Sequence, residues 1–119
     1  MSEDTQSRLK VMRHNTICEV EFTDRKILDE LCIAELQEEL SRLVEAQQGI
    51  KLLLNFGNVE HLSSAALGML ITLNKRVQGQ KGTMKLSDIK PQIMEVFKIT
   101  KLNKLFEIHP SAESARSAF

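Results

Sequence analysis

The chain has no tryptophan and no tyrosine, and its 5 aromatic residues are all phenylalanine. Base-stacking platforms for single-stranded nucleic acids need exposed aromatic rings, so this composition argues against them. An excess of charge is also missing, because 16 basic residues balance 16 acidic ones. No electrostatic field therefore favours nucleic acid or an anionic membrane surface. We expect neither kind of partner.

Long apolar runs are missing as well. The first residues, MSEDTQSRLK, lack the apolar core of a signal peptide, and no apolar stretch reaches the roughly 18 residues of a membrane span. We therefore expect a cytoplasmic protein. Of its two cysteines, Cys18 and Cys32, neither belongs to a CxxC pair and both fall within apolar patterns. They are predicted to be buried thiols rather than a disulfide or a metal site, and no cofactor is expected.

What is present is the composition of an ordinary soluble domain. The chain has 119 residues, of which 42% are hydrophobic and 27% charged. This length suffices for one hydrophobic core without disulfides or metals. We expect a flexible, polar N-terminus over residues 1–8 and a single domain over residues 9–119.

Hydrophobic periodicity predicts alternating strands and helices. In residues 16–22, every second side chain from Thr16 to Phe22 lies on one face, and the other face carries two glutamates. This alternation is typical of a half-buried strand. Strands are also predicted over 9–12, 50–56, 83–86 and 102–108, and helices over 30–48, 64–77, from Pro91 onward, and over 111–119. This order predicts an α/β fold, with a mixed β-sheet of about 4–5 strands and about 4 helices packed mainly on one side.

The most informative segment is residues 49–68, GIKLLLNFGNVEHLSSAALG. An apolar strand leads through a polar bend into Ser63 and Ser64, and these open a second apolar run with helical composition. The arrangement presents a serine at a helix N-terminus, where unpaired backbone N–H groups and the helix dipole favour negative charge. A phosphate on such a serine would be tolerated by the fold and would change the surface.

The order of elements and this segment together resemble the STAS domain of bacterial anti-sigma factor antagonists. Members carry Asp-Ser-(Ser/Thr)-Gly-Leu-Gly after the central strand, and here Ser63-Ser64-Ala65-Ala66-Leu67-Gly68 occupies that place. Phe97-Lys98-Ile99-Thr100-Lys101-Leu102 and Leu105-Phe106-Glu107-Ile108 match the family's C-terminal turn and strand. With Leu67-Gly68 in register, Ser63 stands where the family has Asp, and Ser64 occupies the first hydroxyl position. The resemblance covers residues 8–118.

The resemblance implies a regulatory protein that is not an enzyme. It would bind and sequester an anti-sigma factor, which is also a serine kinase. A serine phosphatase would remove the phosphate that this kinase adds. Ser64 is the implied phosphorylation site, with Ser63 as the alternative, and the protein would be a monomer or weak homodimer. The implied partner-binding residues are Asp29, His61, Ser63, Ser64, Ala65, Leu67 and Gly68.

Other interpretations of the same residues stay open. Ser63 and Asp29 have the residue types and positions of plain helix N-caps. A small serine hydrolase would use His61 as the base for Ser64, although no orienting acid or oxyanion-hole glycine accompanies them. Ala65 and Ala66 replace a hydroxyl residue and a glycine of the family motif, which favours a STAS scaffold of the stressosome type that is never phosphorylated.

Overall fold

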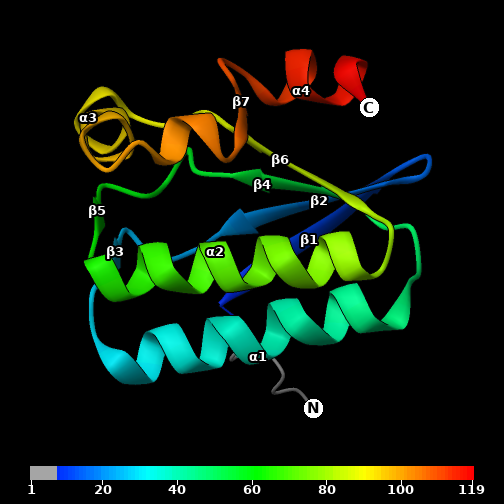
Figure 1. The fold of residues 1–119 in the computed structure, drawn as a ribbon, viewed down its shortest axis with the longest axis horizontal. Coiled ribbons are helices and arrows are strands. Elements are labelled where there is room, and N and C mark those ends of the chain that lie inside the picture. Colours follow the sequence, from blue (N-terminus) through cyan, green and yellow to red (C-terminus); the bar gives the residue numbers. More distant parts are fainter. Residues whose placement is uncertain (1–7) are drawn as a thin grey trace.

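The structure, a computed structural model, describes residues 8–119, so most of the polar segment predicted over residues 1–8 lies outside the described residues. Its centre is a 5-stranded mixed sheet with the strand order β1-β2-β4-β6-β7 (Figure 1). The strands of this sheet are β1 (Leu9–His14), β2 (Ile17–Phe22), β4 (Lys51–Asn55), β6 (Thr83–Ser87) and β7 (Glu107–His109). A second, 2-stranded parallel sheet joins β3 (Lys26–Ile27) to β5 (His61–Leu62). The predicted mixed sheet is confirmed.

Within residues 8–119, four α-helices accompany these strands, and the last of them follows the final strand. They are α1 (Glu30–Ala46), α2 (Ser64–Gly79), α3 (Pro91–Ile99) and α4 (Ala112–Ala118), and a 3-10 turn, η2 (Leu102–Lys104), precedes β7. The hairpin β1–β2 is antiparallel, whereas every other neighbouring pair in the large sheet is parallel. The hairpin turns without glycine because Asn15 takes the left-handed conformation, with φ at 58°.

One face of the large sheet, which we call the front face, carries the hydrophobic core. Alternate residues of the three central strands point to this side and are buried against α1 and α2: Cys18, Val20, Leu52, Leu54, Met84 and Leu86. The two helices lie side by side along the sheet, with their N-termini at the same end of the molecule (Figure 1). The core stripes predicted for both helices are buried as expected, with Leu36, Leu40, Leu70 and Leu73 at 0–1% exposure.

The opposite face, the back face, is covered in part by α4. This helix contacts β4, β6 and β7 and lies across the sheet from α1 and α2 (Figure 1). Its Ala115 is fully buried, and Leu53 of β4 lies on this side, outside the main core cluster. The two long helices, α1 and α2, thus pack on one side as predicted, whereas α4 lies on the back face and α3 lies beside η2 at the end of the sheet (Figure 1).

A chain of aromatic rings joins α3 to the end of the sheet. Phe56, directly after β4, lies 5.0 Å from Phe22 and 6.4 Å from Phe97 of α3 between ring centroids. Phe97 in turn lies 6.0 Å from Phe106. These rings are buried, so α3 is fixed at the end where the parallel strands finish.

Several element boundaries differ from the predictions. Helix α2 continues to Gly79, beyond its predicted end at residue 77, and α1 ends at Ala46 rather than Gln48. The single strand predicted over 102–108 is divided into η2 and the short β7. Strands β3 and β5 have 2 residues each, too few for a periodic pattern to be detected. Within residues 8–119, no helix is both long and apolar enough to cross a membrane.

Candidate docking site

The loop between β4 and β5 positions the two serines, and its own backbone is firmly held. Phe56 and Val59 are fully buried and act as apolar anchors of the loop. The Asn55 side chain accepts a hydrogen bond from the Gly57 N–H at 2.8 Å, and Lys90 of the α3 N-cap donates to the Gly57 carbonyl. Asn58 donates to the carbonyl of Phe22 at 3.1 Å. The segment before α2 therefore has a defined conformation.

Ser63 is the N-cap of α2. Its hydroxyl oxygen accepts a hydrogen bond from the Ala66 N–H at 3.1 Å, and its carbonyl accepts one from Leu67 at 3.1 Å. The plain capping role considered for Ser63 is thus confirmed. Ser64 is the first residue of the helix and is exposed, and the first turn of α2 contains no acidic residue. The N–H groups of Ser64 and Ala65 remain available to an anion at this end.

The short sheet β3–β5 connects the serines to the start of α1. The Ser63 N–H donates to the carbonyl of Ile27 at 3.1 Å, and Ile27 is fully buried. Two residues later, Asp29 caps α1 by accepting a hydrogen bond from the Cys32 N–H at 2.7 Å. The capping role considered for Asp29 is therefore confirmed, and the residue is exposed.

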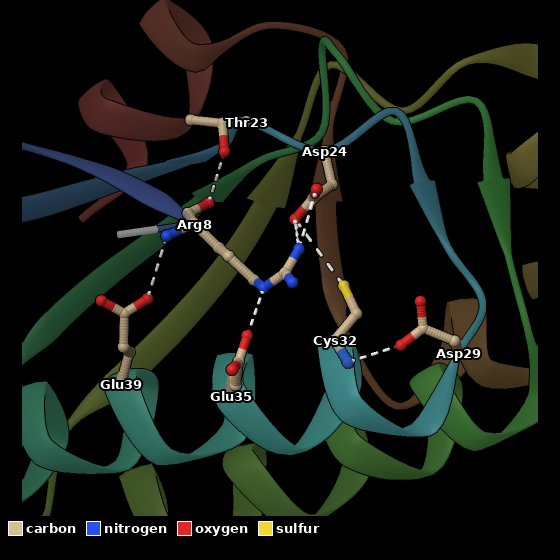
Figure 2. A network of polar contacts seen from close by, with 7 residues as sticks. All are labelled: Arg8, Thr23, Asp24, Asp29, Cys32, Glu35 and Glu39. Atoms are coloured by element: carbon tan, nitrogen blue, oxygen red, sulfur yellow. Dashed lines mark hydrogen bonds and ion pairs between the residues drawn. The ribbon is translucent and has the colours of Figure 1, made fainter. Parts of the chain in front are cut away.

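A polar network around Arg8 holds the segment that enters β3. Figure 2 shows the Arg8 side chain pointing between the loop after β2 and helix α1. Its guanidinium donates to both carboxylate oxygens of Asp24 at 3.1 Å and to Glu35 at 2.7 Å. Hydrogen bonds to Glu35 and Asp24 raise the pKa of Arg8, so this cation stays charged. The network ties the starts of β1, β3 and α1 together.

Cys32 completes this network from inside the first turn of α1. Its thiol lies 3.7 Å from Oδ2 of Asp24, and both cysteines are free and buried, as predicted. Burial is the main cause that raises the pKa of the Cys32 thiol, and the nearby Asp24 carboxylate raises it further. Burial also raises the pKa of Cys18. Both side chains therefore behave as neutral core groups rather than reactive thiolates.

Residues 13–115 match the STAS domain family. The chain belongs to the STAS domain family. The anti-sigma-B factor antagonist of Bacillus subtilis (strain 168) is 31% identical over 78 residues, which cover 66% of this chain and 70% of that protein.

Solved structures agree on the STAS fold. An anti-sigma-factor antagonist (STAS) domain protein from Planctomyces limnophilus superposes with a TM-score of 0.84 at 18% identity, covering 92% of this chain and 96% of that chain. The Bacillus cell fate determinant SpoIIAA in its phosphorylated form superposes with a TM-score of 0.67 at 13% identity, covering 93% and 99% of the two chains. At such identities the likeness concerns the fold, and it confirms the predicted fold class.

The residues expected to bind a partner fall into two groups in this STAS domain. Asp29, His61, Ser64, Ala65 and Gly68 are exposed at the shared N-terminal end of α1 and α2, and Ser63 is half-buried beside them. Leu67 is only 5% exposed and belongs to the hydrophobic core, so it offers almost no surface to a partner. Among the described residues, His61 makes no hydrogen bond to either serine or to an acid, so the arrangement gives no support to a base-activated serine.

Sequence reasoning missed two apolar residues at this end of the STAS domain. Leu28 and Leu31 flank Asp29 and are 48% and 67% exposed, although most large apolar side chains are buried. Leu31 lies off the buried stripe of α1, and this departure from the helical period was the signal that could have identified it. We call the surface formed by the following residues the docking end: Leu28, Asp29, Leu31, His61, Ser64, Ala65 and Gly68.

Proposed function

We propose that this STAS protein is an anti-sigma factor antagonist whose docking end binds an anti-sigma factor with serine kinase activity. In this proposal the kinase phosphorylates Ser64, with Ser63 as the alternative acceptor, and a serine phosphatase restores the unmodified form. Similarity to antagonists in sequence and fold supports the proposal. The unmodified protein sequesters the anti-sigma factor, and the phosphorylated protein releases it.

Gly68 is the observation that carries this proposal. It is the fifth residue of α2 and is exposed, and at such a position inside a helix glycine costs about 1 kcal/mol relative to alanine. A Cβ atom at this position would meet nothing within 4 Å, so the fold itself does not require the absence of a side chain. A partner that packs closely on this turn of α2 does require it. The apolar side chains of Leu28 and Leu31 provide contact area at the same end.

The position of Ser64 explains how a phosphate could act as a switch. A phosphoserine carries about −1.5 to −2 charges at pH 7, and the free N–H groups and dipole of α2 stabilise such a charge. The fold is therefore expected to be unchanged by phosphorylation. Placed in a desolvated interface without an opposing arginine, the same charge weakens binding strongly, because its hydration is lost.

A STAS scaffold that is never phosphorylated is the second candidate. Ala65 and Ala66 stand at the second hydroxyl position and the glycine position of the family motif. These substitutions remove one possible acceptor and favour a constitutive contact. The docking end would then bind its partner in one state only.

Co-purification from the native cells, with the partner identified by mass spectrometry, distinguishes the two candidates. We expect an ATP-binding serine kinase to accompany the wild type and Ser64→Ala, and to be lost with Ser64→Glu. Gly68→Leu should also lose the kinase, because its side chain occupies the space of the partner.

The matched control is Gly79→Leu. Gly79 ends the same helix, and a Cβ atom there also meets nothing within 4 Å, but it is remote from the docking end. We expect Gly79→Leu to retain the kinase. Loss of the partner with both glycine variants, or retention with both, would contradict the assignment of the docking end.

A further inference from the structure

Basic and acidic residues balance over the whole chain, but they are not evenly distributed along it. The segment of residues 96–106, VFKITKLNKLF, contains three lysines and no acid. It includes the end of α3 and the turn η2, which lie against each other at one end of the molecule (Figure 1). The total charge therefore does not describe the surface of this segment.

The three lysines of the segment are exposed and unpaired. In the part of the chain that the structure describes, no hydrogen bond or ion pair involves the side chain of Lys98, Lys101 or Lys104. By contrast, Arg76 of α2 forms an ion pair with a glutamate of α1 at 3.1 Å. The segment thus carries positive charge that no acid within it compensates.

The acids that flank the segment do not cancel this charge. Glu107 forms an ion pair with the buried Lys85 and contacts His109 at 2.8 Å, so its charge is already answered. Glu95 is exposed and lies one turn before Ile99 on α3, where it reduces the local excess from three positive charges to two. A net attraction for anions remains.

Two large apolar side chains project from the same segment. Ile99, the last residue of α3, is 76% exposed, the largest fraction among the large apolar side chains of residues 8–119, and Leu105 directly after η2 is 48% exposed. Side chains exposed to this degree stand on a convex surface rather than in a groove. We call the surface formed by the following residues the basic apolar patch: Lys98, Ile99, Lys101, Lys104 and Leu105.

The residue types of the patch distinguish a lipid surface from a protein partner. Interfaces between proteins are enriched in arginine and aromatic residues and depleted in lysine, since a guanidinium pairs with a carboxylate in two places at once. The basic apolar patch has three lysines, no arginine and no aromatic residue. Lysines on long flexible stems around an apolar tip suit a lipid bilayer, where the tip enters the headgroup region and the ammonium groups meet the phosphates.

We propose that the basic apolar patch binds reversibly to the surface of an anionic phospholipid membrane. Ile99 and Leu105 enter the headgroup region, and Lys98, Lys101 and Lys104 lie at the level of the lipid phosphates. Each lysine near such a surface raises the affinity about fivefold, so the three together contribute about 100-fold. No residue of the docking end belongs to the patch, so this inference does not rest on the proposed function.

Co-sedimentation of the full chain with vesicles tests the proposal. The wild type should be half bound at about 1 mM accessible lipid when the vesicles contain about 50 mol% phosphatidylglycerol in phosphatidylcholine. Its affinity should fall at least about tenfold between about 0.1 M and about 0.5 M salt, because salt screens the attraction. Vesicles of phosphatidylcholine alone should not bind the protein.

Charge variants locate the contact. The triple variant with Lys98→Gln, Lys101→Gln and Lys104→Gln should bind the anionic vesicles about 100-fold more weakly than the wild type. Glu95→Gln should bind about fivefold more tightly, because it removes the opposing charge. The matched control loses three exposed lysines from other surfaces and should bind like the wild type: Lys10→Gln, Lys75→Gln and Lys81→Gln.

A second pair of variants tests the apolar tip without changing any charge. Ile99→Ser should weaken binding about fivefold, because it removes apolar area that would leave water. Leu31→Ser changes a side chain of the docking end that is exposed to a similar degree, at 67%, and should leave binding unchanged.

Four results would overturn the proposal. They are no binding of the wild type to anionic vesicles at low salt, equal binding to phosphatidylcholine vesicles, full binding by the patch triple variant, and equal losses in the patch and control triple variants. Retention of the wild type on immobilised polyglutamate, without binding to vesicles, would also overturn it and would assign the patch to an acidic protein.

Discussion

The two faces of the large sheet are built from the same strands and are held by different forces. On the front face, apolar side chains of β2, β4 and β6 are buried under two helices of 17 and 16 residues. On the back face, one row across the sheet reads Glu19, Leu53, Lys85 and Glu107, and the 7-residue α4 covers part of it. A single leucine separates two charged residues there.

The charges of the back face are satisfied by specific partners. Glu19, whose side chain is 4% exposed, accepts hydrogen bonds from Arg116 of α4 at 2.5 Å and from Asn55 at 3.3 Å. Lys85 forms an ion pair with Glu107, and its Nζ lies 5.1 Å from the ring centroid of Phe119. The front face therefore supplies the stability that fixes α1 and α2, and with them the docking end. The back face mainly determines where α4 docks.

The largest expected effect concerns a neighbouring pair of leucines. Leu54 faces the front core and Leu53 the back face, and both are fully buried. Leu54→Ala should lower the free energy of unfolding by about 4 kcal/mol, and Leu53→Ala by about 2 kcal/mol, because the short α4 can settle into the space. Urea denaturation of both variants measures this difference. Equal losses would show that the two faces contribute alike.

Removing the cation from the back face should have an intermediate effect. Arg116→Ala leaves the buried Glu19 carboxylate without its arginine and should cost about 2 kcal/mol. Arg42→Ala is the control, since the Arg42–Glu38 pair is 67% and 70% exposed and should cost close to zero. Thermal or urea unfolding measures both variants. A negligible loss for Arg116→Ala would mean that α4 is held by Ala115 and Phe119 alone.

A smaller effect should appear in the acid range. Hydrogen bonds from Lys85 and then His109 lower the pKa of Glu107 in the folded protein. A carboxyl group with a lowered pKa stabilises the fold above its ordinary pKa, near 4.5, and this contribution is lost as the pH falls through the folded value. Wild type and Glu107→Gln should therefore differ most in stability near neutral pH and converge once the pH falls below the lowered pKa of Glu107 in the folded protein. A constant difference across the range would contradict this role.

The smallest effect tests whether the front face is closed to solvent. Cys18 of β2 and Cys32 of α1 are 0% and 2% exposed, and both thiols have raised pKa values. In the folded protein neither should react appreciably with a thiol reagent at pH 8, and both should react at once in denaturant. Rapid labelling of native Cys18 would show that the core opens readily.

Strong periodicity explains why the main elements could be predicted. The apolar stripe of α1, the alternation in β2 and the apolar run of β4 each predict one buried surface. The structure has each of these elements, with that surface buried, where the pattern predicts it. The place of α4 could not be predicted, because Arg116 reaches Glu19 across 97 positions and no local pattern encodes that contact. The two-residue strands β3 and β5 are likewise defined by pairing between distant segments.

The candidate site was predictable in its chemistry but less so in its composition. The Ser63-Ser64 pair before an apolar run identified the helix N-terminus, and the structure has Ser63 as the cap and Ser64 exposed. Leu67 could not be recognised as a core residue, because its neighbours Ala66 and Gly68 obscure the helical period. Leu28 and Leu31 become part of the surface only because β3 brings the start of α1 to Ser63.

The proposed switch at Ser64 is tested most directly by intact-mass and peptide mass spectrometry of the protein from its native cells, grown with and without stress. We predict a single phosphate on Ser64 whose occupancy changes between the two conditions. A phosphate on Ser63 would keep the mechanism and move the acceptor by one residue. An unmodified Ser63-Ser64 pair in every condition would contradict the switch and leave the constitutive scaffold as the function of the docking end.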